Sequence, residues 1–374
     1  MTEVGLCSTI ELRRLNRNRV FRWLYRSDKA VTKQELAYNL SMSLPTLTQN
    51  LKELLADGLI DDSGTTESTG GRKPKLFTLV PDARFAVGGE LMADQIRFTA
   101  VDLKGNELAY QVYECPFEND VFYARVLADQ LELFLGETRL DRERLLGVGL
   151  TLPGIVNKSQ IVIPTLNIRG SSVEELTQFI PYRVFLDNDA TCGGFAESWT
   201  RPDLTHMAYL SLGQGVGGSI HVNGEIDFGA NQRAAEFGHM VIHPGGRTCK
   251  CGKHGCLEAY CSASCLSTSL GMSLSTFFSQ LEAGDPACDE IFQQYLDDLA
   301  IGISNIWMAL DCDVVIGGVV SQYLDPYYQQ LDQRLAALNP FGGGMPAVHL
   351  CQFHAKTNGI GAALYYIRDF IETL

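Results

Sequence analysis

The sequence has no long hydrophobic run. Nowhere among its 374 residues do eighteen uncharged apolar residues occur together, which excludes a membrane-spanning helix. The first twenty residues contain no apolar segment fit for a signal peptide. We therefore expect a cytoplasmic protein without a membrane partner, whose eleven cysteines are reduced. The apolar fraction of 45% is that of an ordinary globular protein, and the length suits two or three packed units.

Positive charge is in the minority, with 30 Lys and Arg against 44 Asp and Glu and a net charge of −14. A charge of that sign disfavours nucleic-acid binding, yet the charge is unevenly spread. Residues 1–80 hold 12 basic against 9 acidic residues, and the remainder holds 18 against 35. The basic first part is therefore where a nucleic-acid partner is expected.

Residues 1–80 predict a winged helix-turn-helix. The first helix carries its apolar residues at helical spacing, namely Leu12, Leu15, Val20, Phe21 and Leu24. Thr32 and Glu35 form a capping box that starts a second, short helix. The segment "LPTLTQNLKELLADGLI" predicts a third helix with leucines on one face, and Pro45 suits its first turn. After Gly58, two strands around a Gly/Ser/Thr-rich turn would form the wing.

The third helix is expected in the major groove of DNA, with short polar side chains at the base edges. Arg72 at the wing tip would enter a minor groove, while Lys73 would meet phosphates. The expected DNA-contacting residues are Ser43, Pro45, Thr46, Gln49, Asn50, Lys52, Arg72 and Lys73. The plainer alternative is a small helical bundle with solvated arginines. The order of helix, capped helix, polar-faced helix and basic wing favours DNA binding.

The decapeptide "CKCGKHGCLE" (residues 249–258) predicts a metal site. A disulfide is disfavoured because Cys249 and Cys251 are too close for easy pairing and the number of cysteines is odd. The plainer alternative to a metal site is that the cysteines are reduced and packed as small hydrophobic residues. A polar loop with several glycines disfavours that alternative. Cys261 and Cys265, on the helical stretch that follows, are expected to be buried thiols.

From about residue 84 the sequence alternates strand-like and helical segments. Strands are expected in "FAVGGELMADQIRFTAVDLKGNELAYQVYE", "LLGVGLTLPGIV" and "DVVIGGVVSQ". A helix is expected in "VFYARVLADQLELFLGET", and a strand running into a helix in "YRVFLDNDATCGGFAESW". A glycine-rich hairpin is expected in "MAYLSLGQGVGGSIHVNGEI", and helix at the C-terminus. An α/β protein of two lobes is implied.

These motifs resemble a known family. The segments "LPGIV", "FLDNDATCGGFAESW", "LGQGVGGSI", "AAEFGHM", "CKCGKHGCLEAY" and "VVIGGVVS" occur in the order and spacing of the ROK family of bacterial sugar kinases and sugar-responsive repressors. The N-terminal part, ending in "STGGRKPKL", resembles the winged helix-turn-helix of its repressor branch. The resemblance implies a two-lobed, actin-like fold of the hexokinase type (RNase H-like). The implied parts are a DNA-binding domain (1–80), a smaller α/β lobe (81–190 plus 357–374) and a larger α/β lobe with the zinc loop and an oligomerisation surface (191–356).

The resemblance implies a structural zinc ion, held by His239, Cys249, Cys251 and Cys256. One imidazole and three thiolates form a closed tetrahedral set, which leaves no position for a catalytic water. His243 and His254 remain alternatives for the nitrogen ligand. The metal would hold the loop that carries Glu258 towards a neighbouring pocket.

The resemblance also implies a sugar pocket, formed by Asn167, Asn188, Asp189, Glu236, His239 and Glu258. Converging carboxylates and amides suit a ligand rich in hydroxyl groups. The kinases of the family use the residue at Asp189 as general base. Surface acids of an acidic protein are the plainer alternative, which the placement inside matched motifs disfavours.

One motif departs from the kinases, which cradle ATP phosphates with an Asp-x-Gly-Gly-Thr turn. Residues 90–94 take that place here, and Met92, Ala93 and Asp94 replace the two glycines and the threonine. The acid at the last position would repel a phosphate. In "GQGVGG", Gln214 stands where threonine is usual, and the hairpin's backbone angles can explain the retained glycines. No catalytic residue is therefore expected, and Asp189 would serve only as a hydrogen-bond acceptor.

The predicted function is a sugar-responsive transcriptional repressor that binds operator DNA and a sugar effector as a homodimer or homotetramer. A sugar kinase for a hexose or N-acetylhexosamine, with a DNA-binding domain attached, is one alternative. The other is a regulator without a small-molecule input, controlled by a protein partner through its acidic surface.

Overall fold

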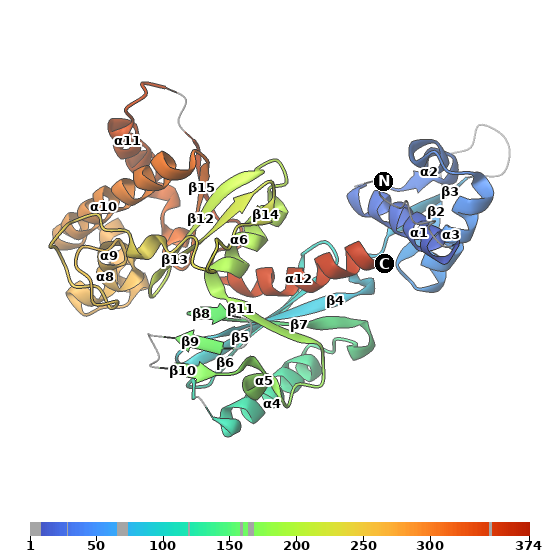
Figure 1. Cartoon of the computed structure of the whole chain (residues 1–374), viewed down its shortest axis with the longest axis horizontal. Coiled ribbons are helices and arrows are strands. Elements are labelled where there is room, and N and C mark those ends of the chain that lie inside the picture. The colour runs from blue at the N-terminus through green and yellow to red at the C-terminus, as the bar shows by residue number, and fades with distance from the viewer. Residues whose placement is uncertain are drawn as a thin grey trace, which may run out of the picture.

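A computed structural model describes residues 9–27, 29–65, 74–118, 120–157, 160–163, 168–343 and 346–374. It separates into a small N-terminal domain and two larger lobes (Figure 1). No helix in these ranges is long and apolar enough to cross a membrane.

The N-terminal domain, called the reader below, has the predicted winged helix-turn-helix order. Its helices are α1 (Thr9–Arg26), α2 (Lys33–Leu40) and α3 (Leu44–Ala56), and its sheet has the strands β1 (Val31–Thr32), β3 (Lys75–Leu79) and β2 (Ile60–Thr65) in that order. The capping box of Thr32 and Glu35 is present, and Ser43 caps α3. Val20, Phe21 and Leu24 are buried as expected, whereas Leu12 and Leu15 are half-exposed because that end of α1 borders an open groove.

The first lobe is built on a five-stranded sheet. Its strands are β4 (Phe85–Leu91), β5 (Gln95–Asp102), β6 (Glu107–Glu114), β7 (Leu145–Leu152) and β11 (Val184–Asn188), in the order β11-β7-β4-β5-β6. The helices α4 (Val121–Glu137) and α5 (Val173–Thr177) cover one face. A small sheet, which the sequence did not suggest, consists of β8 (Ile155–Asn157), β9 (Gln160–Ile163) and β10 (Ile168–Ser171).

The second lobe is built on another five-stranded sheet. Its strands are β12 (His206–Leu212), β13 (Val216–Val222), β14 (Glu225–Ile226), β15 (Asp313–Gly317) and β16 (Val348–Leu350), in the order β14-β13-β12-β15-β16. Its helices are α7 (Glu258–Cys261), α8 (Ala263–Ser267), α9 (Leu274–Glu282), α10 (Pro286–Leu310) and α11 (Tyr328–Leu338). Aromatic residues of α9 and α10 form much of its core, with Phe278 and Phe292 in edge-to-face contact.

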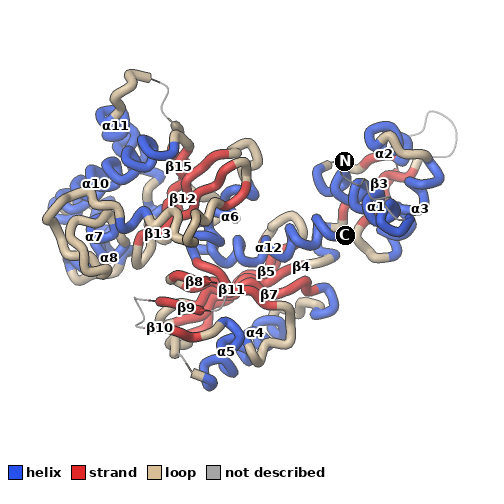
Figure 2. The backbone as a smooth tube through the Cα atoms, viewed as in Figure 1, coloured by secondary structure: helices blue, strands red, loops and turns tan. Residues whose placement is uncertain are grey.

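The two five-stranded sheets have the same topology. In each, the first three strands in sequence are paired antiparallel, one after the other, and two further strands follow on the other side of the first and run parallel to it. Figure 2 shows the strands of both sheets in red. Helices α6 (Asp189–Thr200) and α12 (Thr357–Thr373) pack against each other between the lobes. They approach so closely that a Cβ on Gly361 would lie 1.8 Å from the carbonyl oxygen of Cys192. A duplicated α/β lobe with helices crossing between the copies is the predicted actin-like architecture.

Helix α12 also reaches the reader. Its C-terminal carbonyls accept hydrogen bonds from α1: Asn18 Nδ2 donates to Ile371 (2.7 Å), and Arg14 Nε donates to Thr373 (2.9 Å). Phe21 meets Phe370 edge-on, with ring centroids 6.0 Å apart. These donors satisfy the carbonyls that the end of a helix leaves unpaired. One hydrophobic core therefore runs from the reader into the first lobe.

Candidate functional site

A group of four potential metal ligands lies in the second lobe. The ligand atoms of His239, Cys249, Cys251 and Cys256 all lie within 4.8 Å of one another. His239 directs Nδ1 towards the group, 3.9 Å from Cys249 Sγ, and the Sγ atoms of Cys251 and Cys256 are 3.8 Å apart. One nitrogen and three sulfur atoms at these separations fit a tetrahedral metal ion such as zinc.

The other candidate nitrogen ligands lie outside this group. Nε2 of His243 is 2.6 Å from Oδ1 of the buried Asp298, which also accepts from Gln294. Nδ1 of His254 lies 3.4 Å from the hydroxyl of Thr248. The structure thus selects His239 among the three histidines. The Cys261 thiol is fully buried as expected, while Cys265 is partly buried.

Glu258 joins the metal loop to the glycine-rich hairpin of β12 and β13. Its Oε2 accepts a hydrogen bond from the backbone amide of Val216 (3.1 Å), and Oε1 lies 3.8 Å from Cys249 Sγ. A Cβ on Gly215 would lie 2.7 Å from Oε2. The carboxylate is therefore held by the hairpin on one side and the cysteine loop on the other.

All the hairpin glycines except Gly213 are needed for space rather than for backbone angles, which corrects the sequence-based explanation. None of Gly213, Gly215, Gly217 and Gly218 has a positive φ. A Cβ on Gly217 would lie 2.9 Å from Ala190 Cβ, and one on Gly218 would lie 2.4 Å from the Phe237 ring. These close contacts bring β13 against both α6 and the segment that carries Glu236 and His239.

The second ring nitrogen of His239 faces away from the cysteines. Nε2 lies 4.0 Å from Oε2 of Glu236, and both side chains are partly exposed. A metal on Nδ1 would leave Nε2–H as a donor beside the Glu236 carboxylate. A hydroxyl-rich ligand could use both groups.

Asn188 and Asp189 lie where β11 passes into α6. Asn188 caps the helix through Oδ1, which accepts from the Thr191 amide, and its Nδ2 donates to the Gly154 carbonyl (2.7 Å). Asp189 Oδ1 accepts from the Ala190 amide, and burial raises the pKa of Asp189 to about 6. Asn167, the remaining residue of the predicted pocket, lies outside the described residues.

The turn aligned with the kinase phosphate turn is a tight connection between β4 and β5. The Met92 amide donates to the Gln95 carbonyl, and Asp94 is exposed. Glu90, at the end of β4, is 5% exposed, and burial raises its pKa to about 7. A carboxylic acid with this pKa is partly neutral at physiological pH.

Buried polar atoms that no sequence motif predicted flank the first turn of α12: those of Glu90 and Thr99 face Gly359, whereas Oδ1 of Asn358 faces Gly193 of α6. Oε1 of Glu90, Oγ1 of Thr99 and Oδ1 of Asn358 have no hydrogen-bond partner within the described residues. A Cβ on Gly359 would lie 3.1 Å from Glu90 Oε1 and 3.4 Å from Thr99 Oγ1. No sequence signal marks Thr99 or Asn358, because each stands alone in an apolar strand or at a helix start.

The predicted DNA-contacting face lies on α3 and is mostly exposed. Ser43, Pro45, Thr46, Gln49 and Lys52 all present exposed side chains. Asn50 departs from the expectation: it is 2% exposed, and its Nδ2 donates to the Thr46 carbonyl (2.9 Å). It faces α1 because its position in the helical turn matches that of the buried Leu47 and Leu54. Arg72 and Lys73 lie outside the described residues.

Comparison with known proteins identifies this combination of lobes and cysteine loop. The model of the ROK family matches residues 87–365. The chain belongs to the ROK family. The match covers both lobes and the cysteine loop, whereas the reader lies before it in the chain.

Named relatives fall in both branches of the ROK family. A xylose repressor of Bacillus spizizenii is 24% identical over 297 residues, which cover 76% of this chain and 77% of the relative. An N-acetyl-D-glucosamine kinase of Yersinia pseudotuberculosis is 27% identical over 245 residues, which cover 59% of this chain and 80% of the kinase.

Solved structures show the same fold. An ROK family transcriptional regulator, described as a homologue of the Escherichia coli Mlc protein, has a TM-score of 0.77 at 21% identity, with coverage of 97% of this chain and 98% of that one. An ROK family glucokinase of Streptomyces griseus, in complex with glucose and AMPPNP, has a TM-score of 0.64 at 21% identity, with coverage of 75% and 98%. The regulator thus matches nearly the full chain, reader included.

Proposed function

We propose that this chain is a sugar-responsive transcriptional repressor that has lost ATP-dependent kinase activity. Residues 1–80 would bind operator DNA, and a sugar effector would bind between a smaller lobe (81–190 plus 357–374) and a larger lobe (191–356). One observation carries the proposal. A single chain combines an exposed α3 face with a set of carboxylates around the hairpin, while the turn at 90–94 presents Met92, Ala93 and Asp94.

The names of relatives support this branch. The xylose repressor aligns with three quarters of the chain, and the regulator structure aligns with almost all of it. The effector pocket would use Asn188, Asp189, Glu236, His239 and Glu258, together with Asn167 from the sequence analysis. A polyhydroxylated ligand matches this donor set because each acceptor can take a hydroxyl.

Helix α12 supports a coupling between effector and operator. Its first turn lies beside Glu90 and Thr99, between the lobes, and its last turn is held by Arg14 and Asn18 of the reader. A sugar that draws the lobes together would shift α12 against β4 and move the reader with it. Effector and operator would then be linked reciprocally, by the same factor in each direction.

The metal in this proposal is a structural zinc ion. His239, Cys249, Cys251 and Cys256 would hold it, and no ligand position would remain for a catalytic water. Zinc supplies rigidity here, because it ties together a loop whose end carries Glu258. This chain's own residues do the rest: His239 would offer Nε2–H to the effector, and Glu258 would accept from a hydroxyl.

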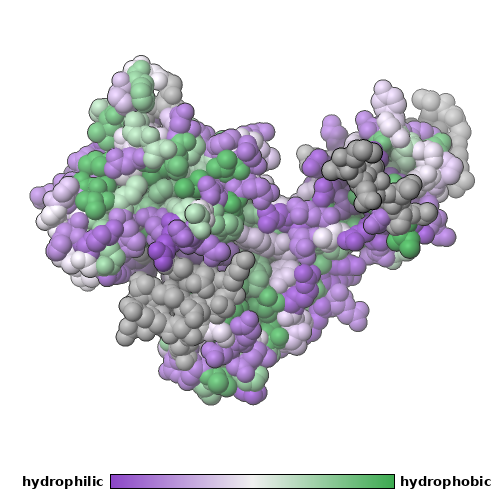
Figure 3. Space-filling view, viewed as in Figure 1, coloured by the Kyte–Doolittle hydropathy of each residue, from purple (hydrophilic) through white to green (hydrophobic). Residues whose placement is uncertain are grey.

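The homodimer or homotetramer expected from the sequence stays part of the proposal. Apolar side chains gather on the second lobe over α10 and α11 (Figure 3), and Met308, Leu338 and Phe341 are exposed there. An exposed apolar patch of this kind is typical of a protein–protein contact. Two readers brought together in this way would bind half-sites about one helical turn or a multiple apart.

A sugar kinase is the second candidate, because the chain keeps Asp189 and resembles a named kinase. The exposed Asp94 argues against it, since its charge would repel a nucleotide phosphate. An assay for ADP release with hexoses and N-acetylhexosamines separates the two functions. We expect no release above the rate without sugar.

Calorimetric titration of the zinc-loaded protein with monosaccharides and sugar phosphates tests the proposal. We expect one sugar to bind without any response to an ATP analogue. Its affinity should change five- to 150-fold, the usual range of allosteric coupling, when operator DNA selected from random duplexes is present. Equal sugar affinity with and without operator contradicts the coupling. A nucleotide that tightens sugar binding supports the sugar kinase instead.

A further inference from the structure

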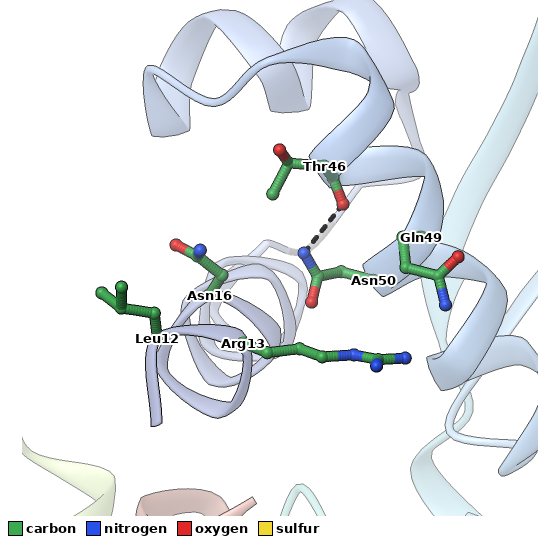
Figure 4. Close-up of a pocket in the computed structure, with 6 residues that line it drawn as sticks. All are labelled: Leu12, Arg13, Asn16, Thr46, Gln49 and Asn50. Carbon is green, nitrogen blue, oxygen red and sulfur yellow. Dashed lines mark hydrogen bonds between the residues drawn. The ribbon is translucent and has the colours of Figure 1, made fainter. Parts of the chain in front are cut away.

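A groove between α1 and α3 lies on the DNA-reading side of the reader (Figure 4). Its volume is about 390 Å³, and its lining residues are Leu12, Arg13, Asn16, Thr46, Gln49 and Asn50. Except for Leu12, the lining is polar, and Arg13 and Gln49 extend side by side towards one end. An acid, Glu53, lies one turn beyond Gln49 on the same helix.

Glu53 binds both of these side chains. Its Oε1 accepts from Arg13 Nε (2.9 Å) and from Gln49 Nε2 (2.9 Å). The hydrogen bond from Arg13 and, to a smaller extent, the one from Gln49 lower the pKa of Glu53. Glu53 is therefore an ionised carboxylate at neutral pH. An ionised carboxylate only accepts hydrogen bonds, so the Gln49 amide must turn its nitrogen towards Glu53.

This arrangement decides which atom Gln49 offers to a ligand. Figure 4 shows its nitrogen on the side of the Arg13 guanidinium and its oxygen turned away. A free glutamine can rotate its amide and present either a donor or an acceptor. Here the oxygen is presented, and it can accept from the exocyclic amino group of adenine or cytosine in the major groove.

Arg13 explains how an acid can occupy a face that meets DNA. A lone carboxylate on α3 would repel phosphates, whereas the guanidinium cancels its charge. The Arg13 side chain is 60% exposed against 22% for Glu53, and a guanidinium has donors to spare beyond those that Glu53 occupies.

We propose that Glu53 is a positioning residue for base recognition, which fixes the Gln49 amide so that the reader selects a base with an amino group. The proposal rests on the DNA-binding function proposed above. It assigns Glu53 and Gln49 a joint role in specificity that neither would have alone.

The chain offers a matched control one helical turn away. Arg17 forms an ion pair with Asp57, again between α1 and the end of α3, through one nitrogen where Arg13 uses two. No glutamine of the reading face donates to Asp57 in the described structure. A role limited to fastening the two helices would therefore be shared by both acids, whereas a role in specificity belongs to Glu53 alone.

The test is selection of binding sites from a library of random duplex DNA by the full-length, zinc-loaded protein. We expect the wild type to prefer adenine or cytosine about tenfold at one position of each half-site. Glu53→Gln should reduce that preference to about twofold, because an amide at residue 53 lets Gln49 turn either way. Asp57→Asn should leave the selected sequence unchanged.

A second variant keeps the test decisive if Glu53→Gln folds poorly. Gln49 is exposed, so Gln49→Met should fold normally and lose the preference at the same position. If Glu53→Gln selects the same sequence as the wild type, the positioning role is wrong but the DNA-binding function stands. The same follows if the wild type requires guanine at the position that Gln49→Met affects. A wild type that enriches no sequence overturns the DNA-binding function as well.

Discussion

At the residue scale, the most unusual groups are two carboxylic acids whose charged forms are disfavoured by burial. Glu90 is the penultimate residue of β4, beside the first turn of α12, and Asp189 begins α6. Burial raises the pKa of Glu90 to about 7 and that of Asp189 to about 6. Buried acids of this kind reduce stability at neutral pH, which is often the cost of a binding site.

Glu90 makes folding stability depend on pH. Because its folded pKa of about 7 exceeds the ordinary value of 4.5, the folded state binds the proton more tightly. The free energy of unfolding should therefore fall as pH rises from about 4.5 to 7 and then level off. Glu90→Gln removes this loss, so the variant should gain on the order of 3 kcal/mol relative to wild type between pH 5 and pH 8.

Chemical denaturation at the two pH values measures this gain. Asp94→Asn is the control, since Asp94 is an exposed acid of the same turn and should give equal differences at both pH values. A Glu90→Gln difference that does not change with pH would contradict the buried, partly neutral acid.

Glu258 should matter for the effector and not for DNA. Glu258→Ala removes a carboxylate held beside the hairpin, so sugar affinity should fall about tenfold to a hundredfold, the range for losing a charged hydrogen bond. Calorimetry with the effector and a mobility-shift assay with operator measure the two affinities. Glu282→Ala, an exposed acid on α9, should change neither. Loss of both affinities in Glu258→Ala would show that the two functions are not separable.

At the element scale, the cysteine loop has little regular secondary structure of its own. Its regular pairing consists of two isolated β-bridges, Val241 with Cys256 and Thr248 with His254. Zinc would therefore supply much of the order of this loop.

Cys251→Ser should reduce the zinc content from about one ion per chain to almost none. Amide hydrogen exchange over residues 240–258 should become faster, and sugar affinity should fall because Glu258 is no longer held. Metal analysis by mass spectrometry and exchange measurements test this. Cys265→Ser should keep its zinc, since Cys265 lies outside the ligand group. Full zinc content in Cys251→Ser would contradict the ligand assignment.

Elements could be predicted wherever a local pattern determined them. The capping box at Thr32 and the glycine-rich hairpin were found because their signals lie within a few residues. The burial of Asn50 and the exposure of Leu12 were not, since both depend on how α1 lies against α3. The small sheet of β8, β9 and β10 was missed because its strands are three or four residues long.

The candidate site likewise has a part that could be predicted from the sequence and a part that could not. The three cysteines lie close together in the sequence, and the family resemblance implied His239 as the fourth ligand; the structure brings all four together. The buried polar atoms of Glu90 and Thr99 beside Gly359 could not be predicted, because these residues are far apart in the sequence and meet only once β4, β5 and α12 are packed. The pairing of Glu53 with Arg13 was missed for the same reason.

At the scale of the whole molecule, α12 packs between the lobes and contacts the reader, and we propose that it carries the effector signal. The double variant Arg14→Ala/Asn18→Ala removes two donors from its last carbonyls and leaves both binding sites intact. Sugar affinity in the absence of DNA should stay within about twofold of wild type. The factor by which operator DNA changes that affinity should fall towards one.

Titration of sugar with and without operator measures this factor. Arg142→Ala, which breaks an exposed ion pair with Glu132 at the far side of the first lobe, should leave the factor unchanged. A double variant with wild-type coupling would show that these two hydrogen bonds do not carry the signal.

The contacts between α1 and α12 also limit how DNA-binding domains can be exchanged between such regulators. The reader is followed directly by the lobe, because β3 ends at Leu79 and β4 begins at Phe85. A chimera joined at that linker would take α1 from one parent and residues 370–373 from the other. The ring of Phe21 and the donors of Arg14 and Asn18 would then face the last turn of a different protein's α12. The exchangeable module is therefore discontinuous: a transplanted reader has to bring the last turn of the chain with it.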